Sequence, residues 1–186
     1  MDGTTVTSAV AMDFDDVVLP HLDAAYRLAR WLVRNEADAE DVVQEASLRA
    51  FRYFRTFSGA NSRAWFLRIV RHACYGWHNT RQQLLTDVFD EEQHSGRQPA
   101  MTPETLLLHA ADAALVEQTL RDLPDRHREL LVLRELEELS YQELADVLGI
   151  PIGTVMSGLS RARHAFRRAL ESRLRQAGLS PHKAAV

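Results

Sequence analysis

The spacing of its apolar residues constrains this chain most, because they recur every three or four positions along most of its length. Such spacing places them on one stripe of a helix, whereas a half-buried strand needs strict alternation. No convincing alternating run occurs, so the sequence predicts an all-α fold. Three amphipathic helices are expected over residues 13–34, 37–55 and 62–81, with Pro20 bending or restarting the first. The predicted inner stripe of that first helix is Phe14, Val18, Leu22, Ala25, Leu28 and Leu32.

The helical pattern breaks in an acidic, polar stretch that contains Gly96, Pro99 and Pro103, which predicts a flexible linker. Helical periodicity then resumes, interrupted at Pro124 and again at Gly149. The chain is therefore expected to form two small helical domains joined by an acidic linker. The expected tail, first domain, linker, second domain and tail cover residues 1–12, 13–81, 82–104, 105–176 and 177–186.

Composition narrows the class of protein. With 186 residues, 46% of them hydrophobic, the chain is long enough for one domain or two small ones. No segment approaches eighteen uninterrupted apolar residues, so no membrane insertion is expected. Cys74 is the single cysteine, which excludes an intrachain disulfide and a cage of thiolates around a metal. These features predict a soluble, cytoplasmic protein.

Charge is distributed unevenly along the chain. The net charge is −4, yet residues 62–81 hold four arginines and no acid, and residues 156–176 hold six arginines against Glu171 alone. Acids gather instead at residues 36–45, 87–92 and 134–143. Because local charge sets the field that a phosphate backbone meets, the pattern predicts two DNA contacts and at least one partner that is not DNA.

The strongest local signal is Ser140 followed three residues later by Glu143, which predicts a capping box at a helix start. That helix should end at Gly149, and another should enter after a short turn, which is typical of a helix-turn-helix. The inner face of the second helix is expected to hold Val155, Leu159, Ala162 and Phe166, and the outer face Ser157, Ser160, Arg161, His164, Arg167 and Arg168. An ordinary helical hairpin with solubilising arginines is the alternative interpretation.

The helix over residues 62–81 combines arginines with an aromatic ring. Phe66, Val70, Ala73, Cys74 and Trp77 share its apolar face, and Arg68, Arg71, His72, Tyr75 and Asn79 the opposite one. Bases stack on rings while guanidinium groups hold phosphates, so this face suits single-stranded or opened DNA. A solvated basic helix is the alternative.

The helix over residues 37–55 is the least suited to DNA. One face carries Asp41, Gln44, Glu45 and Leu48, and the reverse face Val43, Ala46, Ala50 and Phe54. An exposed leucine among acids favours a docking patch for a basic protein partner over a plain solvated face.

These segments resemble the extracytoplasmic-function (ECF) sigma factors of bacterial RNA polymerase. The run DAEDVVQEA from Asp38 is similar to their polymerase-binding helix, and SRAWFLRIVR from Ser62 to their −10 recognition helix. The runs LPDRHRELLVLR from Leu123, LSYQELA from Leu139 and GIPIGTV from Gly149 resemble their −35-reading domain. The motifs occur in the family's order.

The resemblance implies a role for each segment. The polymerase-binding residues would be Asp41, Gln44, Glu45 and Leu48, docking on the β′ clamp helices, and the β flap is a second expected contact. The −10 DNA-binding residues would be Ser58, Asn61, Ser62, Arg68, Arg71, His72, Tyr75 and Asn79. The −35 DNA-binding residues would be Thr154, Ser157, Ser160, Arg161, Arg163, His164 and Arg167. Promoter DNA and an anti-sigma factor are the other expected partners.

Gly158 departs from the family pattern, in which an arginine often stands there. We expect a lower −35 affinity or an unusual −35 sequence, and predict that Gly158→Arg strengthens promoter binding. No catalytic residue, cofactor or metal site is expected, although Cys74 and His78 share a helical face. One alternative is a stand-alone dimeric helix-turn-helix regulator, which would not explain the acidic face over residues 37–55 or the basic, aromatic face over residues 62–81. The other is an interaction protein that occupies polymerase without opening DNA.

Overall fold

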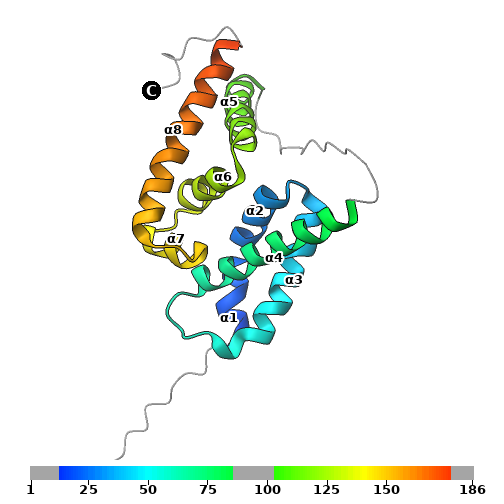
Figure 1. The fold of residues 1–186 in the computed structure, drawn as a ribbon. Coiled ribbons are helices and arrows are strands. Elements are labelled where there is room, and N and C mark those ends of the chain that lie inside the picture. The colour runs from blue at the N-terminus through cyan, green and yellow to red at the C-terminus, as the bar shows by residue number, and fades with distance from the viewer. Residues whose placement is uncertain (1–12, 86–102, 177–186) are drawn as a thin grey trace, which may run out of the picture.

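The computed structural model describes residues 13–85 and 103–176, and each regular element in these ranges is a helix (Figure 1). The all-α prediction is confirmed for this part of the chain. The predicted tails at residues 1–12 and 177–186, and the linker residues 86–102, lie outside the described residues. No helix in the described ranges combines the length and the apolar character needed to cross a bilayer.

The N-terminal lobe begins with a broken helix. Helix α1 (Phe14–Val18) passes into a 3-10 turn that holds Pro20, and α2 (Leu22–Val33) follows. Proline lacks a backbone N–H and its ring clashes with the preceding turn, which is why the helix restarts here as the sequence predicted.

Two longer helices complete this lobe. Asn35 caps α3 (Glu36–Tyr53) by accepting a hydrogen bond from the Asp38 backbone N–H at 3.0 Å. A 3-10 turn and a short loop lead to α4 (Ser62–Leu85), which continues four residues beyond its expected end at residue 81. Helix α4 packs on both α2 and α3, and buries Phe66, Leu67 and Val70 against them.

The C-terminal lobe contains α5 (Pro103–Asp122), α6 (Asp125–Leu131), α7 (Tyr141–Leu148) and α8 (Ile152–Gln176). Pro124 separates α5 from α6, as predicted. The sequence did not indicate that α6 continues as a π-helical turn over Val132–Leu136. This turn leads the chain to Glu137 and Leu139, which are both buried.

The helix-turn-helix prediction is confirmed in detail. The Ser140 hydroxyl accepts from the Glu143 backbone N–H at 3.2 Å, and the Glu143 carboxylate accepts from the Ser140 N–H at 2.7 Å. Gly149 ends α7 in the left-handed conformation, with φ of 67°, which glycine adopts without a steric penalty. The next helix begins at Ile152.

The two lobes pack against each other, an arrangement that the sequence left open. Helix α4 contacts α7, and α2 contacts α6, so the boundary between lobes runs along α4 (Figure 1). One continuous hydrophobic core joins Leu28 and Phe66 of the first lobe to Leu133 and Leu144 of the second. The structure is therefore a closed form of the chain.

Candidate functional site

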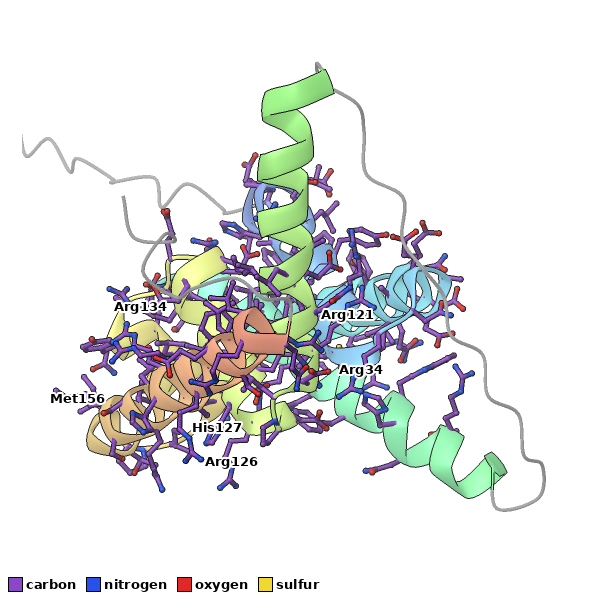
Figure 2. The ribbon with its side chains drawn as sticks, turned by 90° about the horizontal axis from the view of Figure 1, so that it is seen from above. Arg34, Arg121, Arg126, His127, Arg134 and Met156 are labelled. Atoms are coloured by element: carbon purple, nitrogen blue, oxygen red, sulfur yellow. The ribbon has the colours of Figure 1, made fainter. Side chains whose placement is uncertain are left out.

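The outer face of α8 is open to solvent. All the residues predicted to contact the −35 duplex are exposed, namely Thr154, Ser157, Ser160, Arg161, Arg163, His164 and Arg167. Four arginine and histidine side chains line a shallow hollow of about 510 Å³ with Met156 and Ser160. Met156 points away from the N-terminal lobe (Figure 2). The predicted inner residues Val155, Leu159 and Ala162 are buried, because they hold α8 against the lobe's core.

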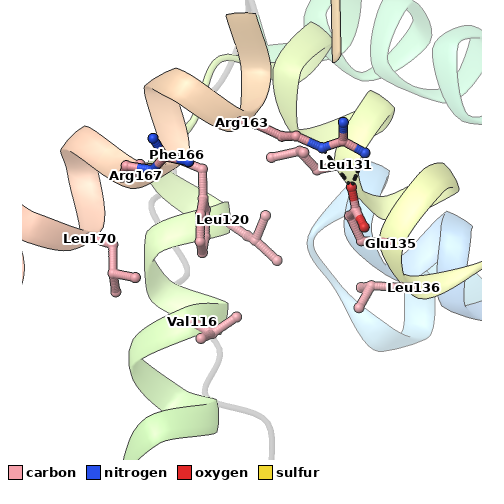
Figure 3. Close-up of a pocket in the computed structure, with 9 residues that line it drawn as sticks. All are labelled: Val116, Leu120, Leu131, Glu135, Leu136, Arg163, Phe166, Arg167 and Leu170. Atoms are coloured by element: carbon pink, nitrogen blue, oxygen red, sulfur yellow. Dashed lines mark hydrogen bonds and ion pairs between the residues drawn. The ribbon is translucent and has the colours of Figure 1, made fainter. Parts of the chain in front are cut away.

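Arg163 differs from its neighbours because it is already paired. Its Nε and Nη2 atoms donate to the Glu135 carboxylate at 3.0 and 2.7 Å (Figure 3). This hydrogen bonding raises the pKa of the Arg163 guanidinium. Both side chains remain about half exposed, at 45% and 50%, so a phosphate could compete with Glu135 for this arginine.

Gly158 is not on the outer face, which corrects the prediction that an arginine there would contact DNA. It is buried on the side of α8 that packs against α6. A Cβ atom at this position would lie 2.9 Å from Leu130 Cδ1, closer than van der Waals contact allows. Gly158 therefore permits the close approach of two helices, and a larger side chain would push them apart.

An apolar groove of about 490 Å³ lies between α5, the π-helical turn and α8 (Figure 3). Val116 and Leu120 project from α5, and Phe166 and Leu170 from α8. Arg163 and Glu135 stand at its edge.

The acidic face of α3 is exposed as predicted for Asp41, Gln44 and Leu48, with Leu48 at 51%. Glu45 is partly covered, because Arg49 Nε donates to its carboxylate at 2.7 Å. That hydrogen bond lowers the pKa of Glu45.

Phe51 is a residue of this face that sequence reasoning missed. It lies three positions after Leu48, on the same side of α3, and is 66% exposed. Its ring packs edge-on against Phe14, with 5.2 Å between ring centroids. The spacing from Leu48 was the available signal, and an aromatic ring among acids strengthens the case for a docking patch.

The basic face of α4 divides into an open and a covered part. Ser58, Arg68, His72 and Asn79 are exposed, whereas Asn61, Arg71 and the hydroxyl of Tyr75 contact the C-terminal lobe, although Tyr75 as a whole remains 38% exposed. Ser62 is bonded within its own lobe, 2.8 Å from His21 Nε2. Burial, and then the charges of Arg71 and Arg68, lower the pKa of His72. The structure thus places every predicted −10 residue on or beside α4, but leaves only some free for DNA.

Glu129 of α6 forms the centre of the covered part. Its carboxylate accepts from Arg71 Nε at 2.6 Å and from the Tyr75 hydroxyl at 3.1 Å. The Arg71 guanidinium also lies 4.8 Å above the Tyr75 ring. Burial and the Glu129 charge raise the pKa of Tyr75 to about 12, so the phenol keeps its proton and can donate.

Glu137 and Glu143 make parallel contacts nearby. Glu137 accepts two hydrogen bonds from Arg27, at 2.7 and 2.8 Å, and one from Arg63 at 3.0 Å. Glu143 accepts from Asn61 Nδ2 at 2.9 Å. Sequence reasoning noted that acids gather around residues 134–143 but did not pair them with the other lobe.

Cys74 and His78 have structural roles. Burial raises the pKa of the Cys74 thiol to about 12, and His78 Nε2 lies 2.9 Å from the Leu32 carbonyl oxygen. Within residues 13–85 and 103–176, no three His, Cys, Asp or Glu side chains converge as metal ligands would.

Two family models match this chain, one in each lobe. The model for Sigma-70 region 2 matches residues 17–83, and that for Sigma-70, region 4 matches residues 113–166. The RNA polymerase sigma-H factor of Pseudomonas aeruginosa is 34% identical, over 88% of this chain and 89% of that protein. The ECF RNA polymerase sigma factor SigE of Mycolicibacterium smegmatis is 30% identical over 88% of this chain, which spans 63% of that relative.

Two solved structures share the fold. The sigma factor RpoE in complex with the anti-sigma factor NepR, from Bartonella quintana, superposes with a TM-score of 0.69 and 28% identity, covering 86% of this chain and 97% of that one. CnrH in complex with the cytosolic domain of CnrY gives a TM-score of 0.61 and 25% identity, covering 86% and 88%.

Proposed function

This chain belongs to the ECF RNA polymerase sigma factors, and from that premise we propose how its two lobes share promoter recognition. The observation that carries the proposal is that three faces of different chemistry lie on three separate helices. An acidic face with exposed apolar residues is on α3, a basic and aromatic face on α4, and an arginine-rich face on α8.

The outer face of α8 would read the −35 duplex. Its N-terminal half is free to enter a major groove, as the second helix of a helix-turn-helix does. Arg161 and His164, with the hydroxyls of Ser157 and Ser160, would reach base edges, and Thr154 would stand at the helix entrance. Arg163 and Arg167 would hold the phosphates that set the register.

The face of α4 would capture the non-template strand of the −10 element. Arg68, His72 and Asn79 are exposed, and Ser58 lies in the loop before the helix. Asn61, Ser62, Arg71 and Tyr75 would complete the surface, with the Tyr75 ring offering a stacking platform for a base. Binding energy from the captured strand would help to open the duplex without ATP.

The exposed face of α3 would dock on the polymerase core. Asp41, Gln44 and Glu45 would pair with basic residues of the β′ clamp helices, and Leu48 would supply apolar contact. The β flap would be the contact of the C-terminal lobe. Catalysis would belong to the polymerase, and the chain would act in the cytoplasm without a cofactor of its own.

An anti-sigma factor is the remaining partner that we propose. Two structural relatives, RpoE and CnrH, were solved bound to NepR and to the cytosolic domain of CnrY. Their similarity over 86% of this chain supports a regulator of the same kind here.

Run-off transcription with purified core polymerase tests the proposal. The wild-type chain should make initiation specific for its own promoters, whereas a stand-alone regulator or an occupying protein would not. Glu45→Lys should impair core binding in a pull-down and reduce the transcript with it. The matched control is Asp23→Lys, an exposed charge reversal on α2 outside the α3 face, which should leave both intact. Normal core binding by Glu45→Lys would contradict the docking face.

A further inference from the structure

Arg163 and Arg167 have the same proposed role on α8 but different surroundings. They lie four residues apart, so they share one side of the helix, and both line the hollow on its outer face. Both are exposed, and the proposed function assigns both to phosphates of the −35 duplex. Arg163, however, is bound by an acid of its own lobe.

The Arg163 guanidinium is held by the segments that lead into the helix-turn-helix. Its Nε and Nη2 atoms both donate to the same oxygen of Glu135, at 3.0 and 2.7 Å (Figure 3). Hydrogen bonding to Glu135, and then to Tyr141, raises the pKa of Arg163. Glu135 belongs to the π-helical turn, and Tyr141 begins α7, where the Arg134 guanidinium lies 5.1 Å from the centre of its ring.

Glu135 occupies the side of Arg163 that suits a phosphate. Carboxylate and phosphate oxygens accept from the Nε and Nη2 donors of arginine in the same geometry, so the two acceptors exclude each other there. Exchange is possible, because both side chains are about half exposed and exposed pairs are weak. The incoming phosphate must still break the pair, and the released carboxylate then repels it.

We propose that Glu135 limits the affinity of α8 for the −35 duplex by competing with a backbone phosphate for Arg163. This inference rests on the proposed assignment of Arg163 to phosphate, and it adds an acid of the same lobe that opposes binding. Each phosphate contact made by an arginine adds to the salt dependence of DNA binding. Glu135 therefore lowers both the affinity and the salt dependence below what the arginines of α8 would give.

The test is a double-mutant cycle on the full-length chain assembled with core polymerase. The probe is a fluorescein-labelled duplex with the −35 element of a promoter transcribed in the run-off assay, and anisotropy is measured at several salt concentrations. Glu135→Gln keeps the size of the side chain and removes its charge. It should bind about threefold more tightly. The slope of log affinity against log salt should become steeper by up to about one unit.

Three comparisons show whether the gain acts through Arg163. Glu138→Gln, which neutralises an exposed acid three residues further along, should leave the affinity close to that of the wild type. The gain from Glu135→Gln should shrink in the background of Arg163→Ala and should persist in the background of Arg167→Ala. Circular dichroism establishes that each variant is folded, and Glu135→Ala repeats the measurement if Glu135→Gln is not.

Unchanged or weaker binding by the folded Glu135→Gln protein would overturn the proposal, and weaker binding would mean that Glu135 orients Arg163 for DNA. An equal gain in the Arg163→Ala background would also overturn it, since the acid would then act by general repulsion of DNA. Failure of the proposed function looks different. The wild type would give no promoter-specific transcript, or adding Arg163→Ala to Glu135→Gln would not weaken binding, which would reject the phosphate assignment itself.

Discussion

Gly158 of α8 faces Leu130 of α6 so closely that a Cβ atom would lie 2.9 Å from the leucine Cδ1. The Leu130 methyl must shift to admit a Cβ atom, so Gly158→Ala should be about 1–3 kcal/mol less stable than its gain in helix propensity alone would make it. Gly158→Arg should cost more and should weaken −35 binding. Urea denaturation of the full chain measures the first effect.

The control for this substitution is Gly153→Ala in the first turn of the same helix, where a Cβ atom meets nothing within 4 Å. It should leave stability unchanged or raise it slightly, since alanine favours helix over glycine. Equal effects of the two substitutions would show that the contact with Leu130 does not restrict position 158.

The capping box gives a second prediction. Ser140→Ala removes the hydroxyl that accepts from the Glu143 N–H, so it should lower the free energy of unfolding by about 1 kcal/mol. Ser160→Ala, at an exposed position within α8, should change stability little. Thermal unfolding of the three proteins compares them. A loss as large for Ser160→Ala would argue against a specific capping effect.

Alanine substitutions of Arg161 and Arg167 should change DNA binding in different ways, because Arg161 is assigned to base edges and Arg167 to phosphates. Arg161→Ala should cost about 1–3 kcal/mol at the cognate −35 duplex and relax discrimination at one base pair. Arg167→Ala should weaken binding to all sequences and reduce the slope of log affinity against log salt by about one unit. Holoenzyme titrations at several salt concentrations separate the two.

Arg175→Ala is the control for these arginine variants, since Arg175 is exposed near the far end of α8. It should leave both affinity and salt slope unchanged. If all three substitutions reduced affinity equally, the face near the start of α8 would have no special role.

The closed form should weaken in acid through Glu143. The hydrogen bond from Asn61, together with those from Ser140, lowers the pKa of this carboxyl from its ordinary value of 4.5. A carboxyl with a lowered pKa stabilises the closed form fully above about pH 4.5, and this stabilisation is lost as pH falls through the lowered value. Dyes on cysteines introduced at Arg55 and Gln142, exposed positions in different lobes, report the closed form by energy transfer, while Cys74 is buried. This energy transfer should be constant above that pH and decline below it.

Asn61→Asp provides the comparison for the pH experiment. It preserves an oxygen that can cap α4, as Asn61 does for the Ala64 N–H at 2.9 Å, but it places a second carboxylate against Glu143. Energy transfer should then be reduced at neutral pH and should rise on mild acidification. The same pH profile in both proteins would show that Glu143 does not contribute to the contact between the lobes.

The local elements were readable from the sequence because their causes are local. Pro20 interrupts the first helix through its own ring, and Ser140 and Glu143 cap each other across three residues. The inner and outer faces of α8 follow from the helical period alone, and Val155 and Arg161 lie where that period places them. The same period places Gly158 beside Val155 and Ala162 on the inner face, so the expectation that an arginine there would contact DNA came from the family resemblance and was wrong.

The tertiary structure alone decided the arrangement of the lobes and the state of the strand-capture face. Arg71 and Glu129 are 58 residues apart in sequence, and Arg27 and Glu137 are 110 apart. Neither the spacing nor the propensity of a residue indicates such a pairing, because it depends on how whole helices dock. The sequence by itself thus determined the helices, their chemical faces and the helix-turn-helix. Packing between the lobes determined which of those faces the closed chain exposes, since a buried carboxylate must find its partner wherever the fold brings one.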